Sequence, residues 1–110
     1  MPAFAIAHLH DVDFGPAIVE YLQRIDGTLQ PFGGRFRVHG ARAEVLEGAL
    51  HGDVVVIEFP DVARAHAWYR SPAYQAILPL RTGHAQGVVA ILDGVDDTHQ
   101  ATDIIASATA

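Results

Sequence analysis

Three side chains have the chemistry that acid–base catalysis needs: His8, Glu58 and Tyr69. His8 and Glu58 lie inside apolar stretches. There, an imidazole that titrates near neutral pH, or a carboxyl group whose proton affinity is raised by burial, can transfer protons. We therefore predict these three as candidate catalytic residues. Each also has a structural interpretation: a histidine bonded to backbone, an ion pair between Glu58 and Arg37 or Arg42, and an aromatic core residue.

A second group, Trp68, Tyr74 and Arg81, has the chemistry of ligand binding. A phenol beside an arginine suits a small anionic or aromatic molecule, because the guanidinium pairs with anions and the rings supply apolar surface. The competing interpretation places the aromatic rings in the core. Ser71, between them, is best explained as a helix N-cap, because no nucleophile-elbow sequence surrounds it.

Metal binding is an alternative for the histidines. His8 and His10 are two residues apart on a predicted strand and therefore project to one face, as zinc ligands can. A zinc site would need a third ligand, for which His84 and Asp53 are the candidates. Because no ligand-spacing motif supports such a site, we expect scattered surface histidines, no metal and no tightly bound cofactor.

Composition limits the classes of function. The 110 residues suffice for one domain, carry a net charge of −6 and include seven arginines but no lysine or cysteine. This charge balance argues against nucleic acid as a partner, and the missing lysine excludes a Schiff-base nucleophile from this chain. Without cysteine there is no disulfide framework. No apolar run approaches the roughly 20 residues that span a bilayer. We expect a cytoplasmic protein with no membrane partner.

Alternation of side chains predicts the strands. Residues 3–10 form a first strand with a small alanine face, which would let helices approach closely, and a larger face. Residues 35–47 predict one long bent ribbon with a bulge near Gly40. Residues 54–59 form the central strand and residues 88–92 the closing strand, which is apolar on both faces.

Apolar spacing and caps predict a first helix. Asp13 is a possible N-cap, and Pro16 fits a first helical turn. Asp26-Gly27 weakens or kinks the helix, and Gly33-Gly34 ends it. Its apolar stripe, at spacings of four and three, consists of Ile18, Leu22, Ile25, Leu29 and Phe32.

Two further helices follow the central strand. Pro60 ends that strand, and Asp61 is the expected N-cap of a helix over residues 62–70. Ser71-Pro72 then starts another helix, with serine as the cap and proline at the first position. Pro79 weakens its last turn.

The order of these elements predicts an α+β domain over residues 1–94. Its ferredoxin-like β-α-β-β-α-β arrangement is an antiparallel four-stranded sheet with helices on one face. Residues 95–110, which are small and polar, predict a flexible tail, with docking on a partner as the alternative.

The other face of this sheet would be bare and apolar. It would carry Phe4, Ile6 and either the Val54/Val56 or the Val55/Ile57 set. Because an exposed apolar face of this size marks an interface, we expect a homodimer packed through the open sheet face with two-fold symmetry.

Strand directions place polar groups at one end of the sheet, where a ligand could enter. The end of the first strand lies near the beginnings of the central and closing strands, and the second helical segment returns to this end. The predicted cluster comprises His8, His10, His51, Asp53 and His84, joined by Tyr69, Ser71 and Arg81.

Several segments occur in an order that is similar to a known family. They are Gly33-Gly34-Arg35-Phe36, Glu44–Gly48, Val56–Pro60 and Trp68–Gln75, with Arg81 beyond. Over roughly Phe4 to Gly94 the chain resembles domain-of-unknown-function family 1330, of the dimeric α+β barrel superfamily. The resemblance implies a ferredoxin-like homodimer. It implies no particular reaction, because superfamily relatives include monooxygenases, haem-degrading, dehalogenating and isomerising enzymes, and ligand-sensing modules.

Two functions remain open. The first is a small homodimeric enzyme without a tightly bound cofactor, acting on a small organic acid or aromatic compound in a pocket between sheet and helices. Its polar lining would be His8, Tyr69, Tyr74 and Arg81, with Glu58 as an outside candidate. The second is a non-catalytic ligand-binding or assembly module. Several convergent titratable groups in the pocket would favour an enzyme, and an apolar pocket with one anchor would favour binding.

Overall fold

The computed structural model describes the backbone of residues 1–109 and the side chains of residues 1–106; Ala110, the last residue of the predicted tail, lies outside the described residues. The elements confirm the α+β expectation. They are β1 (Ala3–His10), α1 (Pro16–Leu29), the 3-10 turn η1 (Gln30–Phe32), β2 (Arg35–Val38), β3 (Asp53–Phe59), α2 (Val62–Arg70), α3 (Pro72–Thr82), β4 (Gln86–Asp93) and α4 (Asp103–Thr109).

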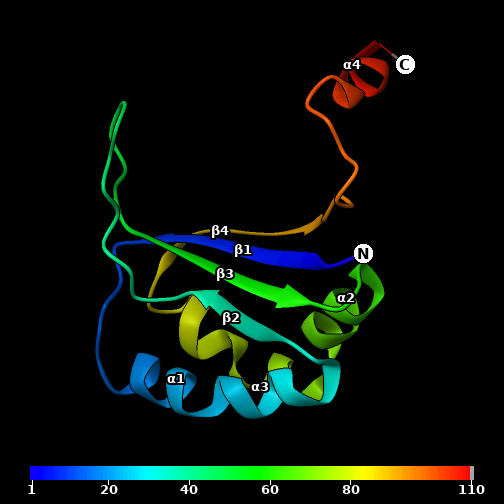
Figure 1. Ribbon diagram of the computed structural model, residues 1–110. Helices are drawn as coiled ribbons and strands as arrows, with labels where there is room; N and C mark the ends of the chain where they lie inside the picture. Colours follow the sequence, from blue (N-terminus) through cyan, green and yellow to red (C-terminus); the bar gives the residue numbers. More distant parts are fainter. Residues whose placement is uncertain (110) are drawn as a thin grey trace.

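One antiparallel sheet organises the chain, with strand order β2-β3-β1-β4. Strands β1 and β3 are the two inner strands. In β1, Ala5 lies between Ile57 of β3 and Ile91 of β4. Helices α1, α2 and α3 cover one face of this sheet (Figure 1). This is the ferredoxin-like arrangement that the order of elements predicts.

The two faces of the sheet have different environments because side chains alternate along each strand. Ala3, Ala5, Ile57 and Phe59 lie on the helix side and are buried in the core, together with Trp68 of α2. The opposite face, which we call the open face, carries no helix. Its side chains include Phe4, Ile6, His8, His10, Arg35, Val38, Val54, Val56, Glu58, Gln86, Val88, Ala90 and Leu92. The Val54/Val56 set is therefore the one on the bare side.

Local signals place the helix ends where the sequence predicts them. The Arg64 backbone N–H donates to the Asp61 carboxylate at 2.8 Å, and the Tyr74 N–H donates to Ser71 Oγ at 3.2 Å. Both residues are N-caps, which satisfy backbone donors that the first helical turn leaves unpaired. Gly33 ends η1 in the left-handed conformation, with φ of 70°.

The N-cap predicted for α1 is wrong, whereas the two predicted weak points lie inside continuous helices. The N-cap of α1 is Gly15, and the Asp13 N–H instead donates to the His84 carbonyl at 2.7 Å. Helix α1 continues through Asp26-Gly27 to Leu29, because packing of its buried face outweighs the weak propensity of glycine. Pro79 likewise lies inside α3 without ending it.

The predicted ribbon over residues 35–47 is also wrong. Strand β2 stops at Val38, and the pairing register shifts between Phe36 and Val38, so the bulge precedes Gly40. Residues 40–52, which we call the arm, are irregular. Gly40, Gly48 and Gly52 have φ of 78°, 75° and 93°, a conformation that breaks strand pairing.

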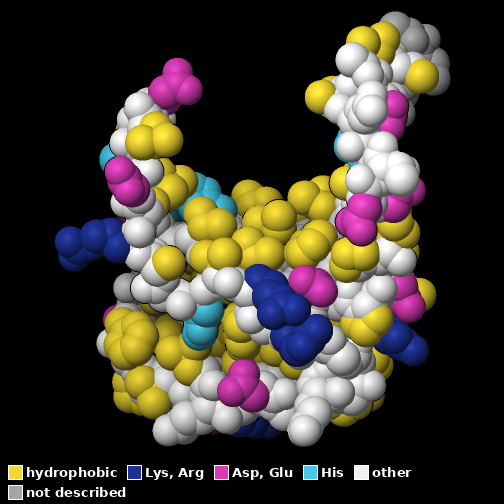
Figure 2. Space-filling model, in the orientation of Figure 1, with side chains coloured by type: hydrophobic (Ala, Val, Ile, Leu, Met, Phe, Trp, Pro, Cys, Tyr) yellow, Lys and Arg dark blue, Asp and Glu magenta, His cyan; other side chains and the backbone are white. Residues whose placement is uncertain are grey.

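The arm and the C-terminal segment project from the sheet on its open-face side (Figure 1). Between them, hydrophobic side chains gather over the sheet (Figure 2). Val88 and Leu92 are 65% and 52% exposed there. The C-terminal segment includes helix α4, and its predicted flexibility stays a prediction.

Candidate functional site

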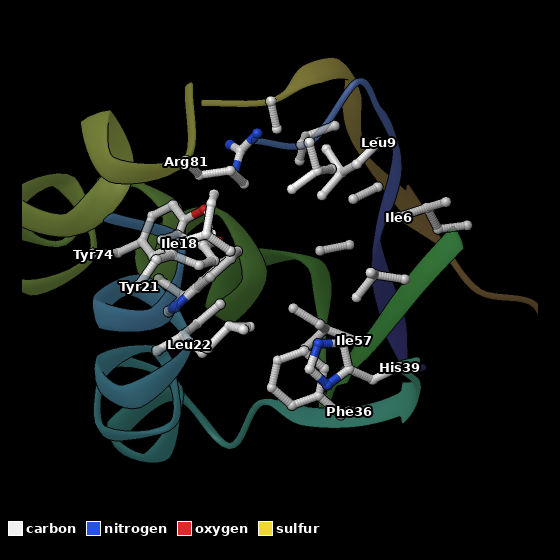
Figure 3. A pocket seen from close by; sticks show the side chains of 18 residues that line it. Ile6, Leu9, Ile18, Tyr21, Leu22, Phe36, His39, Ile57, Tyr74 and Arg81 are labelled. Carbon is white, nitrogen blue, oxygen red and sulfur yellow. Dashed lines mark hydrogen bonds between the residues drawn. The ribbon is translucent and has the colours of Figure 1, made fainter. Parts of the chain in front are cut away.

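A cavity of about 90 Å³ lies between the sheet and helices α1 and α3 (Figure 3). Its helix side consists of Ile18, Tyr21, Leu22 and Ile25 of α1, Trp68 of α2, and Tyr74 and Arg81 of α3. Its sheet side includes Ala5, Ala7, Leu9, Phe36, Val55, Ile57 and Val89. Since one water needs roughly 10–15 Å³ of such space, the cavity has room for a small molecule.

Small residues on β1 create this space. Ala5 and Ala7 face the helices at the centre of the sheet, where larger side chains would fill the layer between sheet and helices. The sequence predicts that this alanine face lets helices approach closely. The helices do cover it, but they leave a cavity above Ala5 and Ala7 instead of closing down on them.

Three polar side chains meet at one end of the cavity, which we call the polar end: Tyr21, Tyr74 and Arg81 (Figure 3). The Tyr21 and Tyr74 hydroxyls hydrogen-bond to each other at 2.8 Å. The Arg81 guanidinium carbon lies 6.0 Å from the centre of the Tyr21 ring, within cation–π range. All three residues are at most 8% exposed.

Burial controls the protonation of this end. It raises the pKa of the Tyr21 hydroxyl far above its ordinary value, and the neighbouring Tyr74 raises it further. For Arg81, burial opposes the charged form, but attraction to Tyr74 and Tyr21 outweighs it, so the pKa of the guanidinium is raised. At neutral pH the end therefore holds one cation and a neutral Tyr21 phenol.

Arg81 has no ionic partner within the protein as described. Among the residues whose side chains the structure describes, no carboxylate lies within ion-pair distance of its guanidinium. Removing a cation from water costs on the order of a few kcal/mol, and the contacts of Arg81 with Tyr74 and Tyr21 offset this cost. Arg81 is therefore a buried cation that lines the cavity without a carboxylate partner among the described side chains.

The cavity wall opposite Arg81 carries Phe36 and His39 (Figure 3). Their rings stack with centroids 4.4 Å apart and an interplanar angle of 17°. Strict alternation of β2 predicts that Phe36 and His39 point to opposite faces. The register shift after Phe36 turns His39 back to the cavity side, where it is exposed at the rim.

Trp68 is fixed in the cavity wall by hydrogen bonds. Its indole N–H donates to Thr28 Oγ1 at 3.0 Å, and the Thr28 hydroxyl donates to the Ile25 carbonyl at 2.7 Å. The Trp68 ring also lies 4.1 Å from the Tyr74 ring between centroids. These contacts hold the aromatic wall rigid around the polar end.

The structure brings together the predicted ligand-binding group but not the predicted catalytic group. Trp68, Tyr74 and Arg81 all line the cavity. His8 and Glu58 lie on the open face, and Tyr69 packs behind Trp68 and Tyr74 without lining the cavity.

His8 and Glu58 both have structural partners. The His8 Nε2–H donates to the His51 carbonyl at 2.6 Å, which connects the end of β1 to the arm. Arg37 Nε donates to Glu58 at 3.1 Å, so the ion-pair interpretation applies with Arg37 and not Arg42.

The histidines at this end of the sheet do not converge on one point. His10 bonds to Asp11 at 2.7 Å, and His84 Nδ1 donates to the Leu80 carbonyl at 3.0 Å. Within the described part of the chain, no group of three or more histidine, cysteine or acidic residues is placed to hold a metal ion.

Two polar residues that line the cavity, Tyr21 and His39, are absent from the sequence-based prediction of the site. Tyr21 lies three residues after Ile18 and four before Ile25, so helical spacing alone would have placed it on the buried face. His39 offers no such signal, because its direction depends on the bulge.

A family model described as a domain of unknown function, DUF1330, matches residues 2–95, which is most of the chain. The chain belongs to the DUF1330 family. The match ends close to Asp93, where β4 ends, so DUF1330 corresponds to the sheet and its three covering helices.

Solved structures share this fold. A protein of unknown function from Rhodopseudomonas palustris is 21% identical, with a TM-score of 0.65 over 86% of this chain and 83% of that one. A dimeric ferredoxin-like protein of unknown function from Jannaschia sp. CCS1 is 16% identical, with a TM-score of 0.66 over 86% of this chain and 100% of that one. At these identities the likeness shows the fold of this DUF1330 member alone.

No curated protein matches the chain. None of the helices in the described part of this DUF1330 chain has the length and apolar character needed to cross a bilayer. The function must therefore be inferred from the cavity and from the surface of the sheet.

Proposed function

We propose that this protein is a cytoplasmic homodimer that binds a small organic acid or aromatic compound in the cavity between the sheet and helices α1 and α3. The observation that carries the proposal is the composition of the cavity. Its walls are aliphatic and aromatic side chains, and its charged group is the buried Arg81. Ligand sites typically combine such apolar walls with a few fixed polar groups.

Binding is favoured over catalysis by the protonation of the polar end. A general base needs a pKa near the working pH, whereas the pKa values of Tyr21 and Arg81 are both raised. These groups hold their protons at neutral pH and serve as hydrogen-bond donors. The catalytic alternative rests on His39, which lines the cavity, because imidazole is the side chain that enzymes most often use for proton transfer.

The open face supports the homodimer. Its apolar strands lie uncovered in a single chain, which is unfavourable in water, and a similar fold from Jannaschia is described as dimeric. A second copy seated on this face would lie between the arm and the C-terminal segment (Figure 1). Two-fold pairing would bury the open faces of both copies against each other.

Filling the cavity tests the ligand site. Short-chain carboxylates and benzoate, each at about ten times its dissociation constant, should stabilise the protein by about 1.4 kcal/mol in a thermal-shift assay. Ala7→Leu places three further carbon atoms in the cavity and should abolish this stabilisation. Ala90→Leu adds the same atoms on the open face and should leave it intact. Equal ligand stabilisation of both variants would show that the ligand binds elsewhere.

A further inference from the structure

The side chains at the polar end carry more hydrogen-bond donors than acceptors. A guanidinium offers five N–H donors and no acceptor, and each phenol offers one O–H donor. One of the two phenol protons is used in the bond between Tyr21 and Tyr74. For the other phenol proton, no second hydrogen bond is formed among the described residues. Donors therefore exceed acceptors around this part of the cavity.

The group that pairs with these donors accepts hydrogen bonds and donates none. A carboxylate meets this requirement: it has two oxygens with about four lone-pair positions and no proton. Its two oxygens match the planar fork of Arg81, and one of them can also accept the remaining phenol proton. An amide or an amine would bring further N–H donors to a site that already has too many.

The rest of the cavity limits the ligand to one charge. The side chains that face Arg81 across the cavity are aliphatic or aromatic, apart from His39 at the rim. A second carboxylate against Ala5 or Ala7 would lie among apolar side chains and would lose its hydration there.

We propose that Tyr21, Tyr74 and Arg81 form a carboxylate-binding subsite, and that the ligand is a monocarboxylate whose apolar body lies against the alanine face of β1. This inference rests on the proposed ligand-binding function. It narrows the choice between an organic acid and a neutral aromatic compound to the acid.

Matched ligand pairs test the charge requirement on the full-length chain. Hexanoate and hexanamide, and benzoate and benzamide, have nearly the same shape but differ in charge and in donors. By isothermal titration calorimetry, each acid should bind at least about tenfold more tightly than its amide, because hydrogen bonds to a charged group are the strong ones. Affinity for the acid should fall as pH drops below about 4.5, where the carboxylate is protonated.

Variants separate the subsite from general apolar binding. Arg81→Met should reduce the preference for acid over amide to about twofold or less, while Arg24→Met, on the exposed surface of α1, should retain it. Tyr21→Phe and Tyr74→Phe should each weaken acid binding several-fold and leave amide binding nearly unchanged.

These experiments separate a failure of the carboxylate subsite from a failure of the ligand-binding cavity. Equal binding of acids and amides, blocked by Ala7→Leu, would overturn the carboxylate subsite and leave the ligand cavity in place. The subsite would also be overturned if the acid bound more tightly at a pH at which its carboxyl group is uncharged than at neutral pH. Failure of all four probes to bind would overturn both the subsite and the proposed function.

Discussion

Arg81 combines three properties that seldom occur together. It is 8% exposed, it faces a cavity, and among the side chains described it has no carboxylate partner. Its neighbours Tyr21 and Tyr74 offset the free energy lost by removing the cation from water. A buried cation that lines a cavity without a carboxylate partner is a candidate for a functional role.

Replacing Arg81 therefore has a predictable effect on stability. In the absence of ligand, Arg81→Met should change the free energy of unfolding by less than about 1 kcal/mol, because it removes both the burial cost of the cation and the contacts with Tyr74 and Tyr21 that offset this cost. Urea unfolding measures this difference. Arg24→Met, which removes an exposed pair with Glu20, should change stability by less than about 0.5 kcal/mol. A loss above about 1 kcal/mol in Arg81→Met would indicate a structural role instead.

The sequence reveals only part of the cavity at this scale. Trp68 and Tyr74 were predictable because each lies three residues from the Ser71 cap, and Arg81 follows two helical turns after Tyr74 on the same side of α3. The bond from Tyr21 to Tyr74 joins residues 53 positions apart, and local patterns do not encode that distance. His8 and Glu58 looked catalytic because they interrupt apolar strands, but those strands alternate, and both side chains point to the open face.

At the scale of elements, caps and alternation determine most boundaries. Helix α2 spans Val62–Arg70 as predicted, because Asp61 and Ser71 satisfy backbone donors at defined positions. The arm departs from its strand prediction. Its sequence alternates between charged and apolar residues, yet Leu46 is 86% exposed and no strand pairs with it. An alternating pattern without a partner strand leaves backbone groups to water and does not form a sheet.

Glycines next to β1 show a close packing that the sequence does not reveal. At Gly52, φ is 93°, and an added Cβ would overlap the Leu9 carbonyl oxygen. Gly52→Ala should therefore lower the free energy of unfolding by about 1–3 kcal/mol. Gly27, inside α1, has nothing within 4 Å of an added Cβ, so Gly27→Ala should raise it by about 0.5–1 kcal/mol.

Urea unfolding of these two glycine variants checks both signs in one experiment. Changes of the same sign would contradict the close approach of Gly52 to the carbonyl oxygen of β1.

For the whole molecule, the open face predicts self-association. Val88, 65% exposed on β4, lies on the face opposite the helices, so Val88→Asp should be tolerated by a single chain but not within a sheet-to-sheet interface. We expect the unmodified protein to sediment as a dimer at micromolar concentration and Val88→Asp as a monomer.

Phe14→Asp provides the matched control. Phe14 is 70% exposed and lies just before α1, outside the sheet, so the same added charge should leave the dimer intact. Sedimentation of the unmodified chain as a monomer would remove the homodimer from the proposal. The ligand cavity would be unaffected, since a single chain supplies all of its walls.

The central claim is that ligands enter the cavity on the helix side of the sheet. Nuclear magnetic resonance of alanine methyl groups during titration with hexanoate tests it most directly, because the two sides of the sheet carry separate reporters. Ala5 and Ala7 line the cavity, and Ala90 lies on the open face. Saturable shifts of the Ala5 and Ala7 methyl signals, with Ala90 unchanged, are the expected result. Shifts confined to Ala90, or to neither side, would contradict it.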